Sequence, residues 1–416
     1  DTCPLCVPAR TALATGVYPT KNGVVYNDWK GVTAGGFEPL HKALQKAGYE
    51  IGHIGVDHIR VKPPMREQGF EFFLNQEDYE AWAAAKNVKT VRKPEELVTV
   101  QEEVDGQYVE KKYSGHRVSQ WENPFETLKD IYFRDHSLEF LRQLPEGKLF
   151  AMFTYLWAPH PPLRVPEPYA SMYPPEKLVL PDNIGITAEG EPPLRRKGVP
   201  AQLAEQVPKE EWRQVWSAHL ALTTMADDVL GMILEELKKQ GKYENTCVVF
   251  TADHGDSLGQ HQMYQKMEMY EESVKIPLVI RLPGAKTGKT AKLVSHLDLK
   301  PTLCEIGGAS AGACDGRSLV PFLEGKEELE QKPAYIQYSG NPSYGTIRRA
   351  VVTERYKYIY DSSHAHELYD LEKDPHEMNN VADDPRYETV LKELHEACKR
   401  FHQDHQDYFD WEGKRK

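Results

Sequence analysis

Four short stretches of this chain are rich in apolar and β-forming residues, and helical stretches lie between them. They span residues 49–56, 148–157, 246–252 and 276–282. Such runs suit strands covered on both faces, as in a parallel sheet between layers of helices. Residues 212–239, between the second and third runs, carry apolar side chains at helical spacing. The alternation predicts an α/β fold with a mixed, largely parallel central sheet flanked by helices.

Two segments depart from this pattern. Residues near 76–125 are polar and charged, and we expect them to form an insertion with a hairpin tip at 101–106. After about Gly325, short alternating strands are expected at 334–338, 346–353, 356–360 and 367–371, followed by a helix at 386–402. We therefore predict a large domain over residues 1–325 and a small antiparallel sheet with one helix over residues 326–416.

Charge and hydropathy exclude several classes of protein. The chain has 416 residues, with 51 Lys and Arg against 63 Asp and Glu, which gives a net charge of −12. This balance argues against a nucleic-acid partner, which would require a basic surface. No apolar run approaches the roughly 18 residues of a membrane span. Composition leaves the compartment open, and a bacterial cytoplasm and periplasm are both compatible with it.

Cysteine spacing near the N-terminus allows several interpretations. Cys3 and Cys6 have the spacing of a redox pair, but the surrounding sequence lacks the small fold that carries such pairs. A zinc site would need a second pair at similar spacing. A phosphatase loop would need Arg six residues after the cysteine, but the residues at that distance from Cys3 and Cys6 are Ala9 and Ala12. What remains is Cys6 with Pro8 and Arg10 at offsets of two and four.

This last pattern resembles the signature of the formylglycine-dependent (type I) sulfatases, within the alkaline-phosphatase-like superfamily. Other motifs occur in the order typical of that family and span most of the chain. They are Ala12-Leu13-x-Thr15-Gly16 with Tyr18-Pro19, Gly48-Tyr49 to His58, Pro159-His160-Pro161, Asp253-His254-Gly255 to His261, Lys266 to Ser273, Ile276-Pro277, and Glu367 to Glu377.

The resemblance implies an alkaline-phosphatase-like fold and hydrolysis of a sulfate ester. In the family a maturation enzyme oxidises the motif cysteine, here Cys6, to formylglycine. One hydroxyl of the aldehyde hydrate attacks sulfur, and collapse of the other expels sulfate. Because residue 6 lies at the start of a predicted helix, the free backbone N–H groups of that helix would also point at the anion. The partners implied are the maturation enzyme and a small-molecule or glycan sulfate ester, with a sulfated carbohydrate as the favoured class.

The resemblance also assigns roles to basic side chains. Arg10 would hold the hydrate or the sulfate, and His58 would hydrogen-bond to the hydrate. His160 would be the acid for the leaving group or a donor to sulfate. Lys266 would contact sulfate as a compact positive charge.

A divalent metal is the second cofactor that the resemblance implies. Asp253 and His254 follow an apolar strand, where ligands bind in open α/β sheets. They would ligate one ion together with residue 6, with Ca2+ expected and Mg2+ or Mn2+ as alternatives. The family takes two further aspartates from a strand upstream of the cysteine motif. The chain shows no such strand before Asp1, so we expect it to be a partial product.

One position departs from the family pattern. Val56 stands where relatives commonly carry a sulfate-binding lysine, and Arg60 is the nearest basic residue that could replace it. The departure supports an alternative activity, hydrolysis of phosphonate or phosphate esters by the same formylglycine chemistry. A non-catalytic protein that binds sulfated glycans is a second alternative.

Overall fold

The computed structural model describes residues 1–28 and 31–411. The helices are α1 (Cys6–Thr15), α2 (Pro19–Asn22), α3 (Leu40–Lys46), α4 (Gln76–Ala85), α5 (Lys129–Gln143), α6 (Val199–Leu203), α7 (Lys209–Lys239), α8 (Glu271–Val274), α9 (Leu299–Ile306), α10 (Val320–Leu323) and α11 (Glu388–Asp404). The strands are β1 (Glu50–Gly55), β2 (Phe72–Asn75), β3 (Leu97–Val104), β4 (Gln107–Ser114), β5 (Val118–Gln120), β6 (Phe150–Tyr155), β7 (Leu163–Val165), β8 (Val248–Thr251), β9 (Leu278–Arg281), β10 (Ala334–Tyr338), β11 (Arg348–Val352), β12 (Tyr356–Asp361) and β13 (His366–Asp370).

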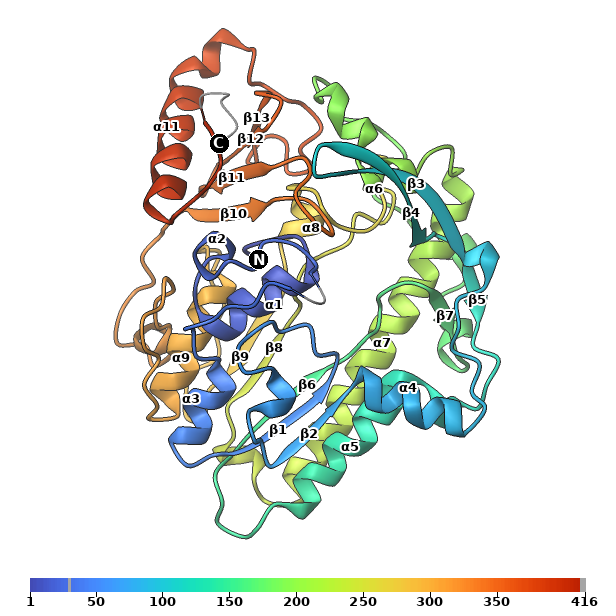
Figure 1. Ribbon diagram of the computed structural model, residues 1–416, viewed down its shortest axis with the longest axis vertical. Helices are drawn as coiled ribbons and strands as arrows, with labels where there is room; N and C mark the ends of the chain where they lie inside the picture. Colours follow the sequence, from blue (N-terminus) through green and yellow to red (C-terminus); the bar gives the residue numbers. More distant parts are fainter. Residues whose placement is uncertain (29–30, 412–416) are drawn as a thin grey trace.

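The four predicted strands at the centre of the molecule are all present. Strands β2, β1 and β6 form a parallel sheet in that order, with Glu50 opposite Phe150 and Gly55 opposite Tyr155. Strands β8 and β9 lie beside it in Figure 1 and pair antiparallel with each other. The predicted α/β class with a mixed, largely parallel sheet is confirmed, because helices pack around these strands.

The long helix α7 supplies much of the core. Its buried face includes Trp212, Met225 and Ile233, which recur at helical spacing, and it packs against α5. The periodicity of residues 212–239 therefore identified this helix, which begins three residues earlier at Lys209. Its buried residues run from Trp212 to Leu237, over most of the length of the helix.

The expectation that every central strand is covered on both faces is wrong for β8 and β9. Phe250 is 40% exposed and Val279, which pairs with it across the two strands, is 60% exposed. Both side chains lie on one face of the two-stranded ribbon. Among the described residues this face is only partly covered, so the apolar runs located the two strands but did not predict how far each is buried.

Two antiparallel units complete the fold. Strands β3 and β4 form the predicted hairpin, with its turn at Asp105-Gly106. Strands β10 to β13 form an antiparallel sheet in chain order, with α11 packed on β11 and β12. Figure 1 shows the β3–β4 hairpin reaching toward the loops of this sheet. No helix among the described residues is both long and apolar enough to cross a membrane.

Candidate active site

Cys6 is the first residue of α1 and is buried. Its Sγ atom lies 3.2 Å from Nε2 of His254, which follows the end of β8. The side chains of His58, which follows β1, and His160, which follows β6, also lie close to this side chain. The ends of three strands therefore bring imidazole groups to the start of one helix, as expected for the carboxyl ends of strands in an α/β sheet.

The electrostatic environment of Cys6 favours a negative charge. Burial would raise the pKa of its thiol, but Lys266 and His254 outweigh burial and hold that pKa well below its usual value. The N-terminal end of α1 adds partial positive charge from unpaired N–H groups. An anionic or strongly polarised atom at the tip of residue 6 is thus stabilised from several sides.

Arg10 lies one helical turn after Cys6 and links two strand ends. Its Nε donates to Oδ2 of Asp253 at 2.7 Å, and its Nη1 donates to the backbone oxygen of Val56 at 2.9 Å. Burial would raise the pKa of Asp253, but Arg10 and then His254 lower it well below its usual value. Asp253 is therefore a carboxylate throughout the neutral range, and Arg10 is fixed in orientation.

Two glycines allow the strand ends to approach their neighbours. A Cβ on Gly55, whose φ is +117°, would lie 2.0 Å from the backbone oxygen of Tyr155. A Cβ on Gly255 would lie 1.9 Å from the backbone oxygen of Glu272. Such contacts exclude any side chain, so these glycines let the loops that carry His58 and His254 pack closely.

The predicted metal ligands lie together. One ligand atom each from Cys6, Asp253 and His254 can be chosen so that all three lie within 4.8 Å of one another. A carboxylate, an imidazole and a third donor at residue 6 fit a divalent cation by donor type. Three donors are fewer than the roughly six to eight that Ca2+ takes. The remaining ligands would have to come from water, substrate or other protein groups.

The segment that carries Lys266 is held in an unusual backbone conformation. Gln265 and Met267, on either side of Lys266, have φ values of +69° and +80°, and Leu258 and His261 earlier in the loop have +46° and +54°. Positive φ is costly for non-glycine residues and persists only where surrounding contacts enforce it.

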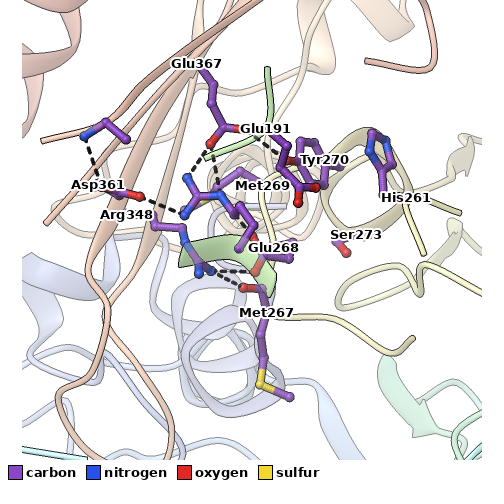
Figure 2. A network of polar contacts seen from close by, with 12 residues as sticks. Glu191, His261, Met267, Glu268, Met269, Tyr270, Ser273, Arg348, Asp361 and Glu367 are labelled. Carbon is purple, nitrogen blue, oxygen red and sulfur yellow. Dashed lines mark hydrogen bonds and ion pairs between the residues drawn. The ribbon is translucent and has the colours of Figure 1, made fainter. Parts of the chain in front are cut away.

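Those contacts come from a buried network of charges, shown in Figure 2. Nη1 of Arg348 lies 3.0 Å from Oε1 of Glu268 and donates to the backbone oxygen of Met267 at 2.8 Å. Arg195 pairs with Asp361 at 2.8 Å and with Glu367. Strands β11, β12 and β13 therefore supply the charged groups of the network that stabilises the Lys266 loop.

The structure brings all seven predicted site residues into one region and adds one that the sequence did not indicate. Oδ1 of Asn27 accepts a hydrogen bond of 3.1 Å from the backbone N–H of Val7, the second residue of α1. Asn27 lies in a loop about twenty residues after the helix start, so helix-capping patterns, which are local, gave no signal for it.

Val56 and Arg60 contribute differently from what their sequence positions indicated. Val56 has a buried side chain, and its carbonyl orients Arg10. The backbone N–H of Arg60 donates to Oγ1 of Thr11 at 3.0 Å. Among the described residues, the Arg60 guanidinium forms no ion pair, and the charge of Arg60 acts on Asp57. The proposal that Arg60 replaces the missing lysine gains no support from these contacts.

Comparison with known proteins gives two matches to family models. The model described as Sulfatase matches residues 2–309. The model described as N-sulphoglucosamine sulphohydrolase, C-terminal, matches residues 259–404. Together these matches extend over the seven site residues and the β10–β13 sheet.

Curated relatives and a solved structure agree with these matches. The multifunctional alkaline phosphatase superfamily protein PehA of Trinickia caryophylli is 29% identical, with 98% of this chain and 86% of the relative covered. A choline-sulfatase of Rhizobium meliloti is 28% identical, with 92% and 74% covered. A structure solved with its substrate, D-glucosamine-2-N,6-O-disulfate, aligns with a TM-score of 0.72 at 22% identity and covers 100% of this chain and 92% of that one. At that identity the structural match establishes the fold.

Proposed function

The chain belongs to the sulfatase family of sulfuric ester hydrolases, and we propose that it hydrolyses a carbohydrate sulfate with a formylglycine formed from Cys6. The observation that carries the proposal is the convergence on the side chain of residue 6. His254 lies 3.2 Å from its Sγ atom, and the side chains of His58 and His160 lie close to it. A buried structural cysteine would not need this set of imidazole neighbours.

In this proposal the Sγ atom stands in for the hydroxyl oxygens of a hydrated aldehyde. The hydrate supplies two hydroxyls on one carbon, so that one can attack sulfur and the other can later expel sulfate. The imidazoles around residue 6 hold those hydroxyls and accept their protons. A maturation enzyme is the partner that would convert Cys6.

The remaining residues act on the charge of the substrate. Lys266 and Arg10 place positive charge beside the sulfate oxygens, where charge shifts during transfer. The Lys266–His160 pair, at 2.9 Å, would supply the proton for the departing alkoxide. A divalent ion held by Asp253, His254 and residue 6 would polarise the sulfate and lower the pKa of the nucleophile.

A neighbour of the same fold supports a carbohydrate substrate. A protein of the same fold was solved with D-glucosamine-2-N,6-O-disulfate as its substrate. The relative named choline-sulfatase shows that a fold of this family also serves a substrate without a sugar. The residues around Cys6 bind the sulfate group and do not themselves select the alcohol.

One alternative reaction has an observation in its favour. A buried valine, Val56, stands at the position where a sulfate-binding lysine was expected. The relative PehA is described as multifunctional. Hydrolysis of a phosphonate or phosphate monoester by the same nucleophile is therefore the second candidate. A protein that binds sulfated glycans without turnover would leave Cys6 unconverted.

Two measurements test the proposal. Mass spectrometry of the peptide that carries residue 6 reports conversion from thiol to aldehyde. The values of kcat/KM for an aryl sulfate, an aryl phosphate and an aryl phosphonate, measured on converted protein, rank the reactions. The proposal fails if residue 6 stays a cysteine in protein that turns over sulfate, or if phosphonate is the preferred substrate.

A further inference from the structure

A second group of possible metal ligands lies on either side of Lys266 in the sequence. His261 precedes Lys266, Glu272 follows it, and Glu377 comes from the segment after β13. One ligand atom from each of the three can be chosen so that all lie within 4.8 Å of one another. We call His261, Glu272 and Glu377 the loop cluster. It shares no residue with the group around Cys6.

His261 is a buried imidazole with unused bonding capacity. Its side chain is 1% exposed, and neither ring nitrogen has a side-chain hydrogen-bond partner among the described residues. The ring stacks on that of Tyr270, with centroids 4.0 Å apart and planes 1° apart (Figure 2). The backbone of His376 acts on the same ring. A metal-binding histidine commonly directs one nitrogen at a backbone oxygen, which leaves the other nitrogen for the ion.

Glu272 has one carboxylate oxygen that is bonded and one that is not. Its Oε1 accepts hydrogen bonds from the neutral amides of Gln260, at 2.7 Å, and Asn183, at 3.4 Å. Its Oε2 is buried without a hydrogen bond among the described residues, and lies 3.7 Å from Nε2 of His261. A buried carboxylate is costly unless a cation or a proton neutralises it.

The nearby ammonium group of Lys357 is already committed to other acceptors. It lies 2.8 Å from Oε1 of Glu271 and 2.8 Å from Oε1 of Glu377. It also donates to the backbone oxygen of Met269 at 3.0 Å. An ammonium group has three donors, and these three contacts use them all. Glu272 is therefore left without a directly bonded cation.

The distance between His261 and Glu272 distinguishes a metal ion from a proton. A hydrogen bond between Nε2 and Oε2 would need about 2.7–3.2 Å, so 3.7 Å is too long for one. Two ligands of a tetrahedral zinc ion, each about 2.1 Å from the metal, lie about 3.4 Å apart. Burial raises the pKa of Glu272, but a proton there would leave His261 without a bond. The spacing is that of two ligands to one ion.

We propose that the loop cluster binds a structural zinc ion through Nε2 of His261 and one carboxylate oxygen each from Glu272 and Glu377. Zinc accepts imidazole and carboxylate ligands together, whereas Ca2+ prefers oxygen ligands alone. The fourth position remains for water or a second carboxylate oxygen. The ion fastens the Lys266 loop, at both of its ends, to the segment that follows the C-terminal sheet. This site exists whatever ester the enzyme hydrolyses.

The test counts zinc in protein whose active site has lost its own ligands. A background of Cys6→Ala with Asp253→Asn removes two of the three candidate ligands there. His261→Gln and Glu272→Gln are then added to it one at a time. Glu272→Gln keeps the shape of the side chain and removes its charge.

His53→Gln is the matched control in the same background. His53 is also a fully buried imidazole without a hydrogen bond among the described residues. Its ion-pair contact is with the single carboxylate of Asp57, at 3.9 Å. It therefore reports the effect of losing a buried histidine that belongs to no cluster of ligands.

After dialysis against Zn2+ and gel filtration, the background protein should retain one zinc ion per chain, and zinc should raise its Tm by a few degrees. His261→Gln and Glu272→Gln should each weaken zinc binding by about a hundredfold or more and abolish the rise in Tm. His53→Gln should change the zinc affinity by less than about twofold.

A background protein that retains no zinc would overturn the site. Unchanged zinc affinity in His261→Gln would do the same, because the ion would then lie elsewhere. If the variants do not fold, diffraction from wild-type crystals grown with zinc decides. An anomalous peak between His261 and Glu272 at the zinc absorption edge supports the site, and the lack of one rejects it. Zinc content needs no turnover, so this test and that of the proposed function can fail separately.

Discussion

The Nζ atom of Lys266 lies 2.9 Å from Nε2 of His160, while Nδ1 of His160 lies 2.6 Å from the backbone oxygen of Pro161. An ammonium group only donates and a carbonyl oxygen only accepts. His160 therefore carries its proton on Nδ1 and accepts at Nε2. Burial and then Lys266 lower the pKa of His160 to about 4, which agrees with a neutral ring. In this arrangement the proton between the two side chains belongs to Lys266, and Nε2 of His160 accepts it.

This pairing predicts strong coupling between the two residues. Lys266→Ala and His160→Ala should each lower kcat/KM by about a hundredfold or more, because each removes one half of a proton-transfer pair. The double variant should be little worse than the poorer single variant. Steady-state kinetics on an aryl sulfate measures all three. Additive losses would mean that the two residues act independently.

Cys6 and Cys3 should respond in opposite ways to substitution. Cys6→Ala removes the nucleophile and should lower kcat by about a thousandfold or more. Cys3→Ala, at a buried position three residues earlier, should retain most of the activity and lose some stability. Thermal unfolding of both variants serves as the control for folding. An inactive, folded Cys3→Ala protein with active Cys6→Ala would show that the motif has been misassigned.

Arg10 should not be replaceable by lysine. Its guanidinium donates at once to Asp253 and to the backbone oxygen of Val56, and a lysine ammonium at the same position cannot span both acceptors. We expect Arg10→Lys to lower kcat/KM by about tenfold or more. Arg60→Ala is the comparison, with a change of less than about twofold. If Arg60→Ala lowers kcat/KM as much as Arg10→Lys does, Arg60 supplies the positive charge that is absent at position 56.

Metal removal should reduce activity without unfolding the protein. Treatment with a chelator is expected to abolish turnover, because possible ligand atoms of Asp253, His254 and residue 6 lie within 4.8 Å of one another, close enough to share one ion. Adding back Ca2+, Mg2+ or Mn2+ one at a time, with Tm measured alongside, identifies the ion that binds the folded state. Ca2+ is expected to restore the most activity. Full activity after exhaustive chelation would remove the metal from the site.

A buried ion pair in the C-terminal sheet gives a prediction about pH. Arg349 on β11 pairs with Asp407 at 2.7 Å, and both side chains are fully buried. Burial would raise the pKa of Asp407, but Arg349 lowers it below its ordinary value. The stabilising contribution of this carboxylate is therefore complete above the pKa of the unfolded chain, about 4, and is lost as the pH falls through the lower folded value.

The measurement is the free energy of unfolding of Asp407→Asn at several pH values. We expect a loss of about 3 kcal/mol at pH 7, since the variant leaves the Arg349 charge buried and unpaired. The difference from the wild type should shrink below about pH 4. Arg386→Ala, which breaks a pair on the surface, is the control and should change stability by less than about 1 kcal/mol. If the difference in unfolding free energy between the variant and the wild type does not change with pH, the ionised Arg349–Asp407 pair is not its cause.

The sequence by itself determined the parts of the fold and of the site whose signals are local. Apolar runs located the strands β1, β6, β8 and β9, and the spacing of apolar side chains located α7. Arg10 could be placed near Cys6 because an offset of four residues returns a helix to the same face. Asp253 and His254 could be placed at the site because ligands bind at the carboxyl ends of strands.

Only the tertiary structure decided the contacts between segments that lie far apart in the chain. Asn27 capping α1, Arg348 holding the Lys266 loop, and Tyr26 beside Tyr344 have no repeating pattern in the sequence. The hydrogen bond from Arg10 to the carbonyl of Val56 could not be predicted for a different reason. Every residue carries a backbone carbonyl, and only the fold decides which one contacts Arg10. Periodicity reports which side chains share a face of one element. Which faces and loops then meet depends on how whole elements pack, and that is settled by burial and backbone geometry across the entire domain.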